Sequence, residues 1–421
     1  MLIVLVVIIE LYFEEDIANK GEIFLGKVIF FNIPAHGHTN PTLALVKELI
    51  NQGEEVLYYS FPNLKDKIEE TGATYMPYSI ERLEDTNYTE EQLKYFPIVF
   101  RVCIESTEKM LEFLLNEVDR EKPDYIIHDS LATWGKYVGH IKNIPTICST
   151  TTFPFHKSFL NIPKELVNLL FQFARGDLKH LVKALSIQTN ICKKYNMKKP
   201  PLLDALSSKE KLNIVFTAAE FTPNGNVFDQ TYCFVGPSIS ERIEGEKVNL
   251  PSSNKPLVYI SLGSIFGDNK EFYEDCFHAF KDIEATFILS LGNKMKETDF
   301  SFIPENFILF SYVNQLDLLQ KADIFVTHGG MNSVQEGLYF KVPLILYPQQ
   351  QEQEMIAQQV ERLGCGIHLK ECNSEKLKQS LLKLLNNNDY KQKSIEFGTL
   401  LQEKGGYKRA VFEIMRFYKR S

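Results

Sequence analysis

Buried strands and amphipathic helices alternate from residue 27 onward. Residues 28–33 (VIFFNI) form a nearly continuous apolar run, which is typical of a strand covered on both faces. Apolar residues then recur at helical spacing from 43 to 50, after a polar turn at 34–40, and residues 56–59 (VLYY) form the next apolar run. A strand, a helix and a second strand within roughly 32 residues have the size of one βαβ unit.

The same alternation continues to the C-terminus and predicts a parallel, doubly wound sheet in each half of the chain. Further strands are expected at residues 125–127, 214–216, 257–261, 286–290, 323–327, 343–347 and 366–369. Residues 152–199 interrupt the pattern with phenylalanines among helical stretches, including Phe153, Phe155, Phe159, Phe171 and Phe173. This part indicates apolar helices or loops inserted between sheet elements.

The predicted organisation is therefore α/β, with two Rossmann-like domains joined by one linker. A polar stretch with Pro and Gly at its ends, 236–256, is the best linker candidate. We expect a first domain at 27–235, a second domain at 257–403, and a C-terminal amphipathic helix within 404–421 that packs back on the first domain. Residues 1–26 form an N-terminal extension, and the sequence is compatible with either a natural or an appended segment.

The sequence of this extension matches neither a membrane span nor a signal peptide. Residues 2–9 are an unbroken apolar run, but eight residues cannot cross a bilayer, which needs about 20. Basic residues before the run and small residues after it, as in a signal peptide, are also missing. The rest of the sequence contains no transmembrane candidate, so we expect a cytoplasmic protein without a stable membrane anchor.

Composition excludes several classes of protein. The chain has 421 residues, of which 44% are hydrophobic and 24% charged, as in ordinary globular proteins. The formal net charge is −8 and no long Lys/Arg run occurs, which disfavours nucleic-acid binding. The seven cysteines are scattered without a CxxC pair, so neither a disulfide framework nor a zinc site is expected.

Polar and glycine residues follow five of the predicted strands. In open α/β sheets, ligands bind beyond the carboxyl ends of the strands. The five segments are His36-Gly37-His38, Asp129, Leu262-Gly263-Ser264, HGGMNS at 328–333, and QQQEQ at 349–353. We expect the two domains to face each other at these ends.

The sharpest of these segments is THGGMNSVQE at 327–336. Paired glycines allow a ligand close to the backbone, and Asn332 and Ser333 begin a helix whose free amides attract an anion. With His328 as a further donor, the segment predicts a diphosphate cradle that lacks the GxGxxG spacing. A plain strand–turn–helix junction with an Asn cap would look the same, and the residues alone leave both interpretations open.

Two long segments resemble one family. Residues 310–366 (FSYVNQLDLLQKADIFVTHGGMNSVQEGLYFKVPLILYPQQQEQEMIAQQVERLGCG) resemble the donor-binding signature of UDP-glycosyltransferases, closest to the bacterial macrolide and flavonoid glycosyltransferases of the GT-B fold. Residues 33–56 (IPAHGHTNPTLALVKELINQGEEV) are similar to the start of the same family. The resemblance covers residues 27–421 and implies a hexosyltransferase whose two Rossmann-like domains face across a cleft.

The resemblance also implies roles for individual residues. His38 would activate the acceptor hydroxyl, with Asp129 as its carboxylate partner. His36, two residues away, could instead be a surface turn residue. The implied donor residues are Ser264, His328, Gly330, Asn332 and Ser333 for the diphosphate, Tyr312 and Val313 for uracil, Gln315 and Glu336 for the ribose, and Glu352 and Gln353 for the sugar hydroxyls.

Four positions depart from the family pattern. Asn314 replaces a proline, and Gln350 and Gln351 replace small residues. The Glu352–Gln353 pair stands where many bacterial relatives have Asp–Gln, and the longer carboxylate side chain bears on the identity of the donor sugar.

The implied chemistry is consistent with these residue types. A histidine can take the acceptor proton, and a carboxylate behind it fixes the ring tautomer. Helix amides and His328 can offset charge on the leaving diphosphate. The sequence contains no DxD motif, so it does not suggest a metal, and no cofactor is expected besides the co-substrate, a UDP-sugar with UDP-glucose preferred.

Three functions remain open from the sequence. The leading one is an inverting, metal-independent glycosyltransferase acting on a small apolar hydroxyl compound, such as a macrolide, a flavonoid or another phenolic. The second is a non-catalytic nucleotide-sugar-binding or auxiliary protein, which would have no need of both His38 and Asp129. The third is a lipid glycosyltransferase at a membrane surface, for which Lys193, Lys194, Lys198 and Lys199 supply a small basic cluster.

Overall fold

The computed structural model describes residues 26–79, 95–155, 178–200, 208–241, 245, 248, 254–263, 269–292 and 294–419. Ser264, three of the five phenylalanines named above (Phe159, Phe171 and Phe173), part of the predicted linker and residues 1–25 lie outside this set. Among the described residues, no helix combines the length and apolarity that crossing a membrane requires.

The first domain is built on a seven-stranded sheet in the order β3-β2-β1-β4-β5-β6-β7, and every pair is parallel. Its strands are β1 (Lys27–Phe31), β2 (Glu55–Ser60), β3 (Thr74–Pro77), β4 (Tyr125–Asp129), β5 (Thr146–Thr150), β6 (Leu212–Val215) and β7 (Tyr232–Phe234). Its helices are α2 (His36–Asn51), α3 (Lys65–Glu69), α4 (Phe96–Glu121), α5 (Thr133–Lys142) and α7 (Leu178–Lys194), with short 3₁₀ turns at Pro62–Leu64 and Gly225–Val227.

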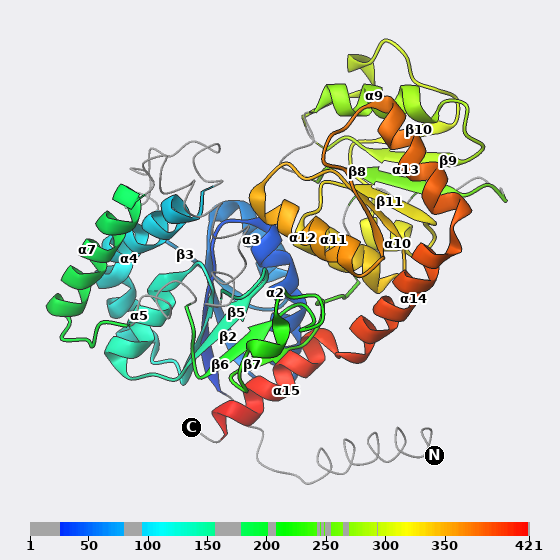
Figure 1. Ribbon diagram of the computed structural model, residues 1–421. Helices are drawn as coiled ribbons and strands as arrows, with labels where there is room; N and C mark the ends of the chain where they lie inside the picture. The colour runs from blue at the N-terminus through cyan, green and yellow to red at the C-terminus, as the bar shows by residue number, and fades with distance from the viewer. Residues whose placement is uncertain are drawn as a thin grey trace, which may run out of the picture.

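Both faces of this sheet are buried, as its apolar strands predict. In β1, Val28 and Phe30 pack into the core on the side of α2, whereas Ile29 and Phe31 pack on the side of α4, α5 and α7. A strand whose consecutive residues all lie in apolar surroundings must be covered on both faces. Figure 1 shows the helices lying on either side of the sheet.

The second domain repeats this plan with a six-stranded parallel sheet in the order β10-β9-β8-β11-β12-β13. Its strands are β8 (Leu257–Ser261), β9 (Thr286–Ser290), β10 (Phe307–Phe310), β11 (Ile324–Thr327), β12 (Leu344–Leu346) and β13 (Gly366–His368). Its helices are α9 (Lys270–Phe280), α10 (Gln315–Leu319), α11 (Met331–Tyr339), α12 (Gln351–Arg362), α13 (Ser374–Asn386) and α14 (Asn388–Glu403), with a 3₁₀ turn at Glu297–Asp299. The predicted α/β class with two Rossmann-like, doubly wound domains is confirmed.

The strand order reverses once in each sheet, between β1 and β4 and between β8 and β11. The chain winds outward in one direction, returns to the middle, and then winds in the other. At such a switch point the loops after the two central strands diverge and leave a crevice, which is where ligands bind in these folds. In the first sheet, His38 follows the central strand β1 and Asp129 ends the central strand β4. In the second sheet, His328 follows the central strand β11.

The sequence analysis did not predict four of the strands and placed the start of one helix too late. β5 is fully buried yet reads Thr-Ile-Cys-Ser-Thr, so it shows no apolar run, and β3, β7 and β10 are short. The predicted polar turn at 34–40 is wrong in length: α2 begins at His36, because the N–H groups of His38 and Thr39 already bond to the Ala35 carbonyl. His38 therefore lies in the first turn of a helix.

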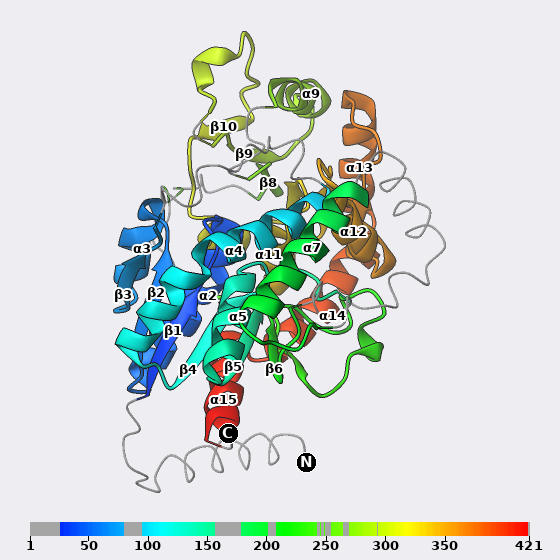
Figure 2. The same cartoon turned by 90° about the vertical axis from the view of Figure 1, so that its left-hand side faces the viewer.

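The C-terminal helix α15 (Gly406–Tyr418) crosses from the second domain back to the first. Figures 1 and 2 show it running beneath the first sheet, where Ala410, Val411 and Ile414 join the core on the α2 side. The Tyr418 ring packs on Tyr125 of β4 with centroids 4.9 Å apart. The last helix of the chain thus completes the core of the first domain.

Replacing Ile414 with Ala should destabilise the first domain by about 2–5 kcal/mol, because it leaves a cavity in a fully buried site. The matched control is Ile395→Ala on α14, where the side chain is 36% exposed and the cost should stay within about 0.5 kcal/mol. Urea unfolding followed by circular dichroism measures both. Equal midpoints for the two variants would show that α15 does not contribute to the core of the first domain.

Candidate active site

The carboxyl ends of the two sheets face each other, and a cleft between the domains is lined by Pro41 of the first domain and by Asn332 and Glu336 of the second. Helix α11 of the second domain packs against α2 of the first, so the loops after β11 and β1 come together. Two of the chain segments that sequence analysis singled out, 36–38 and 328–333, meet at this contact. The cleft is therefore lined by residues of both domains.

His38 and Asp129 form a hydrogen-bonded pair on the wall of the first domain. His38 Nδ1 lies 2.8 Å from Asp129 Oδ2, and the other carboxylate oxygen accepts the Leu131 N–H at 2.8 Å. The Thr151 hydroxyl lies 3.1 Å from the same ring nitrogen, a contact that the sequence analysis did not predict. Because both contacts use Nδ1, a proton held there leaves Nε2 as the lone-pair nitrogen of the neutral ring.

The electrostatic surroundings favour the charged form of His38. Burial alone would lower the pKa of His38, but the negative charge of Asp129, its hydrogen bond and a further contribution from Glu352 raise the pKa above the usual 6.5. The Asp129 carboxylate is fully buried and the His38 side chain is 13% exposed. The histidine can thus gain a proton at the edge of the cleft while its partner stays away from water.

A chain of hydrogen bonds holds the first turn of α2 against strands β1 and β2. The Asn32 amide donates to the Tyr58 hydroxyl at 2.6 Å and to the His38 carbonyl at 3.2 Å. Tyr58 Oη lies 2.7 Å from the Thr42 hydroxyl, which donates to the Thr39 carbonyl at 2.8 Å. These contacts join β1, β2 and α2, and they hold the backbone of His38 in one position.

His328 forms part of the opposite wall, and glycines make room for its ring. A Cβ at Gly330 would lie 2.6 Å from His328 Nε2, and one at Gly263 would lie 2.8 Å from Cε1. Both are closer than real side-chain contacts, so these positions require glycine while His328 stays in place. Burial lowers the pKa of His328 to about 4, which keeps the ring neutral at pH 7.

Gln315 and Glu336 form a second pair deeper in this domain. The Gln315 amide donates to Glu336 Oε2 at 2.6 Å, and the Tyr259 hydroxyl donates to Gln315 Oε1 at 3.1 Å. Nearby, Tyr312 is 38% exposed and Val313 is buried. Asn314, which departs from the family pattern, accepts the Asp317 N–H at 3.3 Å and caps α10, so it begins the helix in place of a proline.

Glu352 and Gln353 lie in the first turn of α12. Gln353 Oε1 accepts the Gln349 N–H at 2.7 Å, so this side chain offers its amide N–H groups to a ligand, whereas its oxygen already has a donor. Protein from both domains surrounds Glu352, although water still reaches it, and this enclosure raises its pKa while the charge of His38 lowers it. Glu352 and His38 thus influence each other across the cleft.

Some of the predicted site residues contact other parts of the protein or lie at the surface. Asn332 donates from Nδ2 to the Gly37 carbonyl at 2.9 Å, which is a bond between the two domains. Ser333 follows it in the first turn of α11, half-buried. His36 is exposed at the start of α2. Among the described residues, no group of three or more His, Cys, Asp and Glu side chains could hold a metal ion.

Comparison with known proteins decides the family. The family model described as UDP-glucoronosyl and UDP-glucosyl transferase matches residues 212–417. The UDP-glucosyltransferase YojK of Bacillus subtilis, itself uncharacterized, is 32% identical over 402 residues, spanning 94% of this chain and 98% of YojK. This chain belongs to the UDP-glycosyltransferase family. The NDP-glycosyltransferase YjiC of Bacillus licheniformis agrees, with 33% identity over 402 residues, 93% of this chain and 97% of that one.

A solved structure supports the same fold. The calicheamicin glycosyltransferase CalG4 superimposes with a TM-score of 0.80 at 21% identity, over 94% of this chain and 99% of that one. At this identity the likeness shows the fold, and the predicted GT-B architecture is confirmed. The protein is accordingly a glycosyltransferase with a two-domain cleft.

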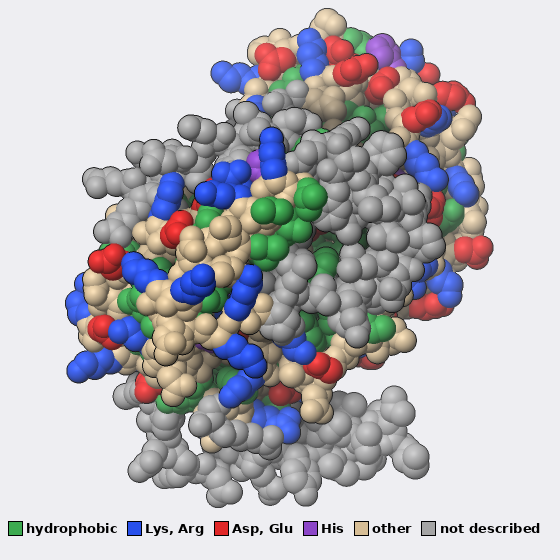
Figure 3. Space-filling model, turned by 60° about the vertical axis from the view of Figure 1, so that its left-hand side comes forward, with side chains coloured by type: hydrophobic (Ala, Val, Ile, Leu, Met, Phe, Trp, Pro, Cys, Tyr) green, Lys and Arg blue, Asp and Glu red, His purple; other side chains and the backbone are tan. Residues whose placement is uncertain are grey.

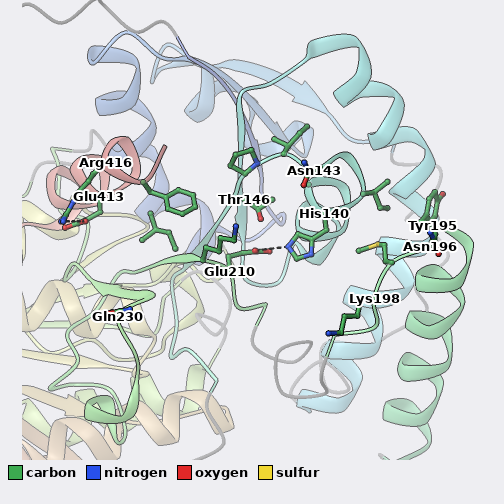
Figure 4. A pocket seen from close by; sticks show the side chains of 18 residues that line it. His140, Asn143, Thr146, Tyr195, Asn196, Lys198, Glu210, Gln230, Glu413 and Arg416 are labelled. Atoms are coloured by element: carbon green, nitrogen blue, oxygen red, sulfur yellow. Dashed lines mark hydrogen bonds and ion pairs between the residues drawn. The ribbon is translucent and has the colours of Figure 1, made fainter. Parts of the chain in front are cut away.

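A separate cavity of about 1310 Å³ lies at the opposite end of the first sheet of this glycosyltransferase. Figure 4 shows His140 and Glu210 joined there by a hydrogen bond of 3.1 Å, with Arg416 of α15 at the rim. Burial opposes ionisation of Glu210, but its contacts with His128 at 3.5 Å and His140 at 3.1 Å lower its pKa to about 2. His128 is buried between this carboxylate and the Asp129 backbone, so it supports the sheet end and lies outside the cleft.

Replacing Asp129 with Asn should lower the pKa of His38, because it removes the charge that favours the imidazolium. In the native protein the pair adds stability below about pH 6.5, and this contribution is lost as pH rises through the raised pKa of His38. Proton NMR of the histidine ring signals, assigned with His38→Ala, measures the shift. An unchanged His38 titration would show that the pair does not control its charge.

Proposed function

We propose that this glycosyltransferase transfers a hexose with inversion from a UDP-sugar, UDP-glucose in the first instance, to a hydroxyl of a small apolar acceptor. The observation that carries the proposal is the pairing of His38 with buried Asp129 on one wall of a cleft whose other wall holds the donor-type residues of α11 and α12. A protein that only bound nucleotide sugars would need the second wall alone.

The reaction then proceeds by a single displacement. His38 Nε2 takes the proton of the acceptor hydroxyl as its oxygen bonds to the anomeric carbon. The bond from that carbon to the diphosphate oxygen breaks on the opposite face, and UDP leaves with the electron pair, so the configuration inverts. Asp129 stabilises the imidazolium and keeps the ring proton on Nδ1, as in other base–carboxylate pairs.

The second domain supplies the groups that accept the leaving UDP. His328, neutral at pH 7, can donate a hydrogen bond to the diphosphate, and the N-terminal amides of α11, including that of Ser333, attract its charge. Glycine at 330 lets phosphate oxygens approach the backbone. Tyr312 would stack on uracil and the Gln315–Glu336 pair would bind the ribose.

The sugar would lie between the two walls. Glu352 and Gln353 begin α12, and the mutual electrostatic influence of Glu352 and His38 supports a sugar-binding role for this carboxylate beside the base. A carboxylate fork suits two adjacent equatorial hydroxyls, as in glucose, with Gln353 adding an amide donor. Transfer in one step requires this proximity of base and sugar.

The acceptor is proposed to be a macrolide, a flavonoid or another phenolic. The resemblance to enzymes of that kind supports a small molecule, as does the name of CalG4 as a calicheamicin glycosyltransferase. A lipid at a membrane surface is the second candidate, because α7 exposes Leu178 and Val182 beside Lys179 and Lys183. Figure 3 shows Lys and Arg side chains near hydrophobic ones on this side of the molecule.

His38→Ala should lower turnover by about 10²–10⁴-fold, because the general base is removed, while UDP affinity stays the same. Product formation is followed by mass spectrometry with UDP-sugars against a panel of phenols, macrolides and sterols, and UDP binding by calorimetry. The matched control is His36→Ala, two residues away and exposed at the start of α2. Near-normal turnover in His38→Ala, or a dead His36→Ala, would overturn the assignment of the base.

Glu352→Ala should reduce the preference for UDP-glucose over UDP-galactose by about tenfold to a hundredfold, because the carboxylate no longer rejects a misplaced hydroxyl. UDP alone should bind as tightly as before, since the residues proposed for uracil, ribose and diphosphate are unchanged. Initial rates with both UDP-sugars and calorimetry with UDP measure this. A loss of UDP affinity equal to the loss of rate would assign Glu352 to the nucleotide or the fold.

A further inference from the structure

We propose that the Asn332 side chain is an interdomain latch, which joins the donor-binding helix α11 to the one carbonyl of α2 that Pro41 leaves without its helical donor. The latch holds the base-bearing turn of α2 against the donor wall, so Asn332 is a positioning residue for His38. Its kinetic consequences rest on the function proposed above, whereas its structural consequences do not.

Pro41 creates the acceptor for this bond. In an α-helix the N–H of residue 41 would donate to the carbonyl of residue 37, but proline has no N–H and its ring pushes that carbonyl outward. Gly37 is exposed at the edge of the cleft. The sequence of α2 thus presents one backbone oxygen, directly before His38, to the second domain.

Asn332 supplies the donor. Its Nδ2 lies 2.9 Å from the Gly37 oxygen, across 295 positions of the chain. A side-chain amide carries two N–H donors, and one of them satisfies Gly37.

The bond acts on His38 through the backbone. The Gly37 carbonyl belongs to the peptide unit that also contains the His38 N–H, and Asn32 holds the His38 carbonyl from the other side at 3.2 Å. Breaking the latch frees the first turn of α2 on the cleft side only. The rest of the interface is retained, because Arg362 and Lys404 separately contact the Glu220 carbonyl and carboxylate at 2.7 and 2.9 Å.

The test is a mutant cycle between the two domains. Asn332→Ala should lower kcat by about three- to tenfold with UDP affinity within twofold of wild type, because one exposed hydrogen bond and its alignment of the base are lost. Pro41→Ala restores the helical donor to Gly37, so the Asn332→Ala effect should be clearly smaller in that background. Asn51→Ala, at the far exposed end of α2, is the matched control and should leave kcat unchanged.

A readout independent of activity separates this proposal from the proposed function. With UDP bound, hydrogen exchange of peptides covering residues 36–42 should be faster in Asn332→Ala than in wild type or Asn51→Ala. If wild type transfers no sugar, the proposed function fails and the exchange result still decides the latch. Multiplicative kinetic effects, unchanged exchange, or a tenfold loss of UDP affinity in Asn332→Ala would overturn the latch and make Asn332 a diphosphate ligand alone.

Discussion

The buried carboxylate of Asp129 is the constraint on which the first half of the active site depends. An ionised carboxylate without water is unfavourable unless hydrogen bonds and a positive partner compensate it. Here the Leu131 N–H and His38 provide them at 2.8 Å each. Since Asp129 ends β4 and His38 follows β1, the pair can form only because these strands are neighbours at the point where the strand order reverses. The topology of the sheet therefore determines where the base can be.

The second domain has the same topology, but its histidine at the switch point has a lowered pKa instead of a raised one. Its switch point lies between β8 and β11, and the ring that follows β11 is His328, which burial keeps neutral. Beside Asp129 a histidine gains a proton more easily, whereas in the crowded glycine-lined pocket it loses one. Two histidines, one after β1 in the first sheet and one after β11 in the second, thus have pKa values shifted in opposite directions. One can accept a proton, and the other can donate a hydrogen bond without adding charge.

Sequence reasoning recovered what depends on local pattern. The apolar runs of β1, β4 and β8 identified the central strands, and the polar residues at their ends identified the cleft. It missed β5, because Thr and Ser interrupt its pattern although the strand is fully buried between neighbours. It also missed the contact of Thr151 with His38 and that of Asn332 with Gly37, because these join residues more than a hundred positions apart. The Thr151 contact depends on the strand order of the first sheet, and the Asn332 contact depends on how the two domains pack.

Asn314 and Pro41 show that the effect of an asparagine or a proline on a helix depends on its position in that helix. A proline and a capping asparagine both begin a helix, the first because it needs no N–H donor and the second because its side chain accepts a free one. Asn314 takes the capping role in α10, so that helix keeps its start. Pro41 lies beyond the first turn of α2, where the same missing N–H leaves a carbonyl without its donor. A residue that would weaken an isolated helix there becomes compatible with the fold because the other domain supplies the hydrogen bond.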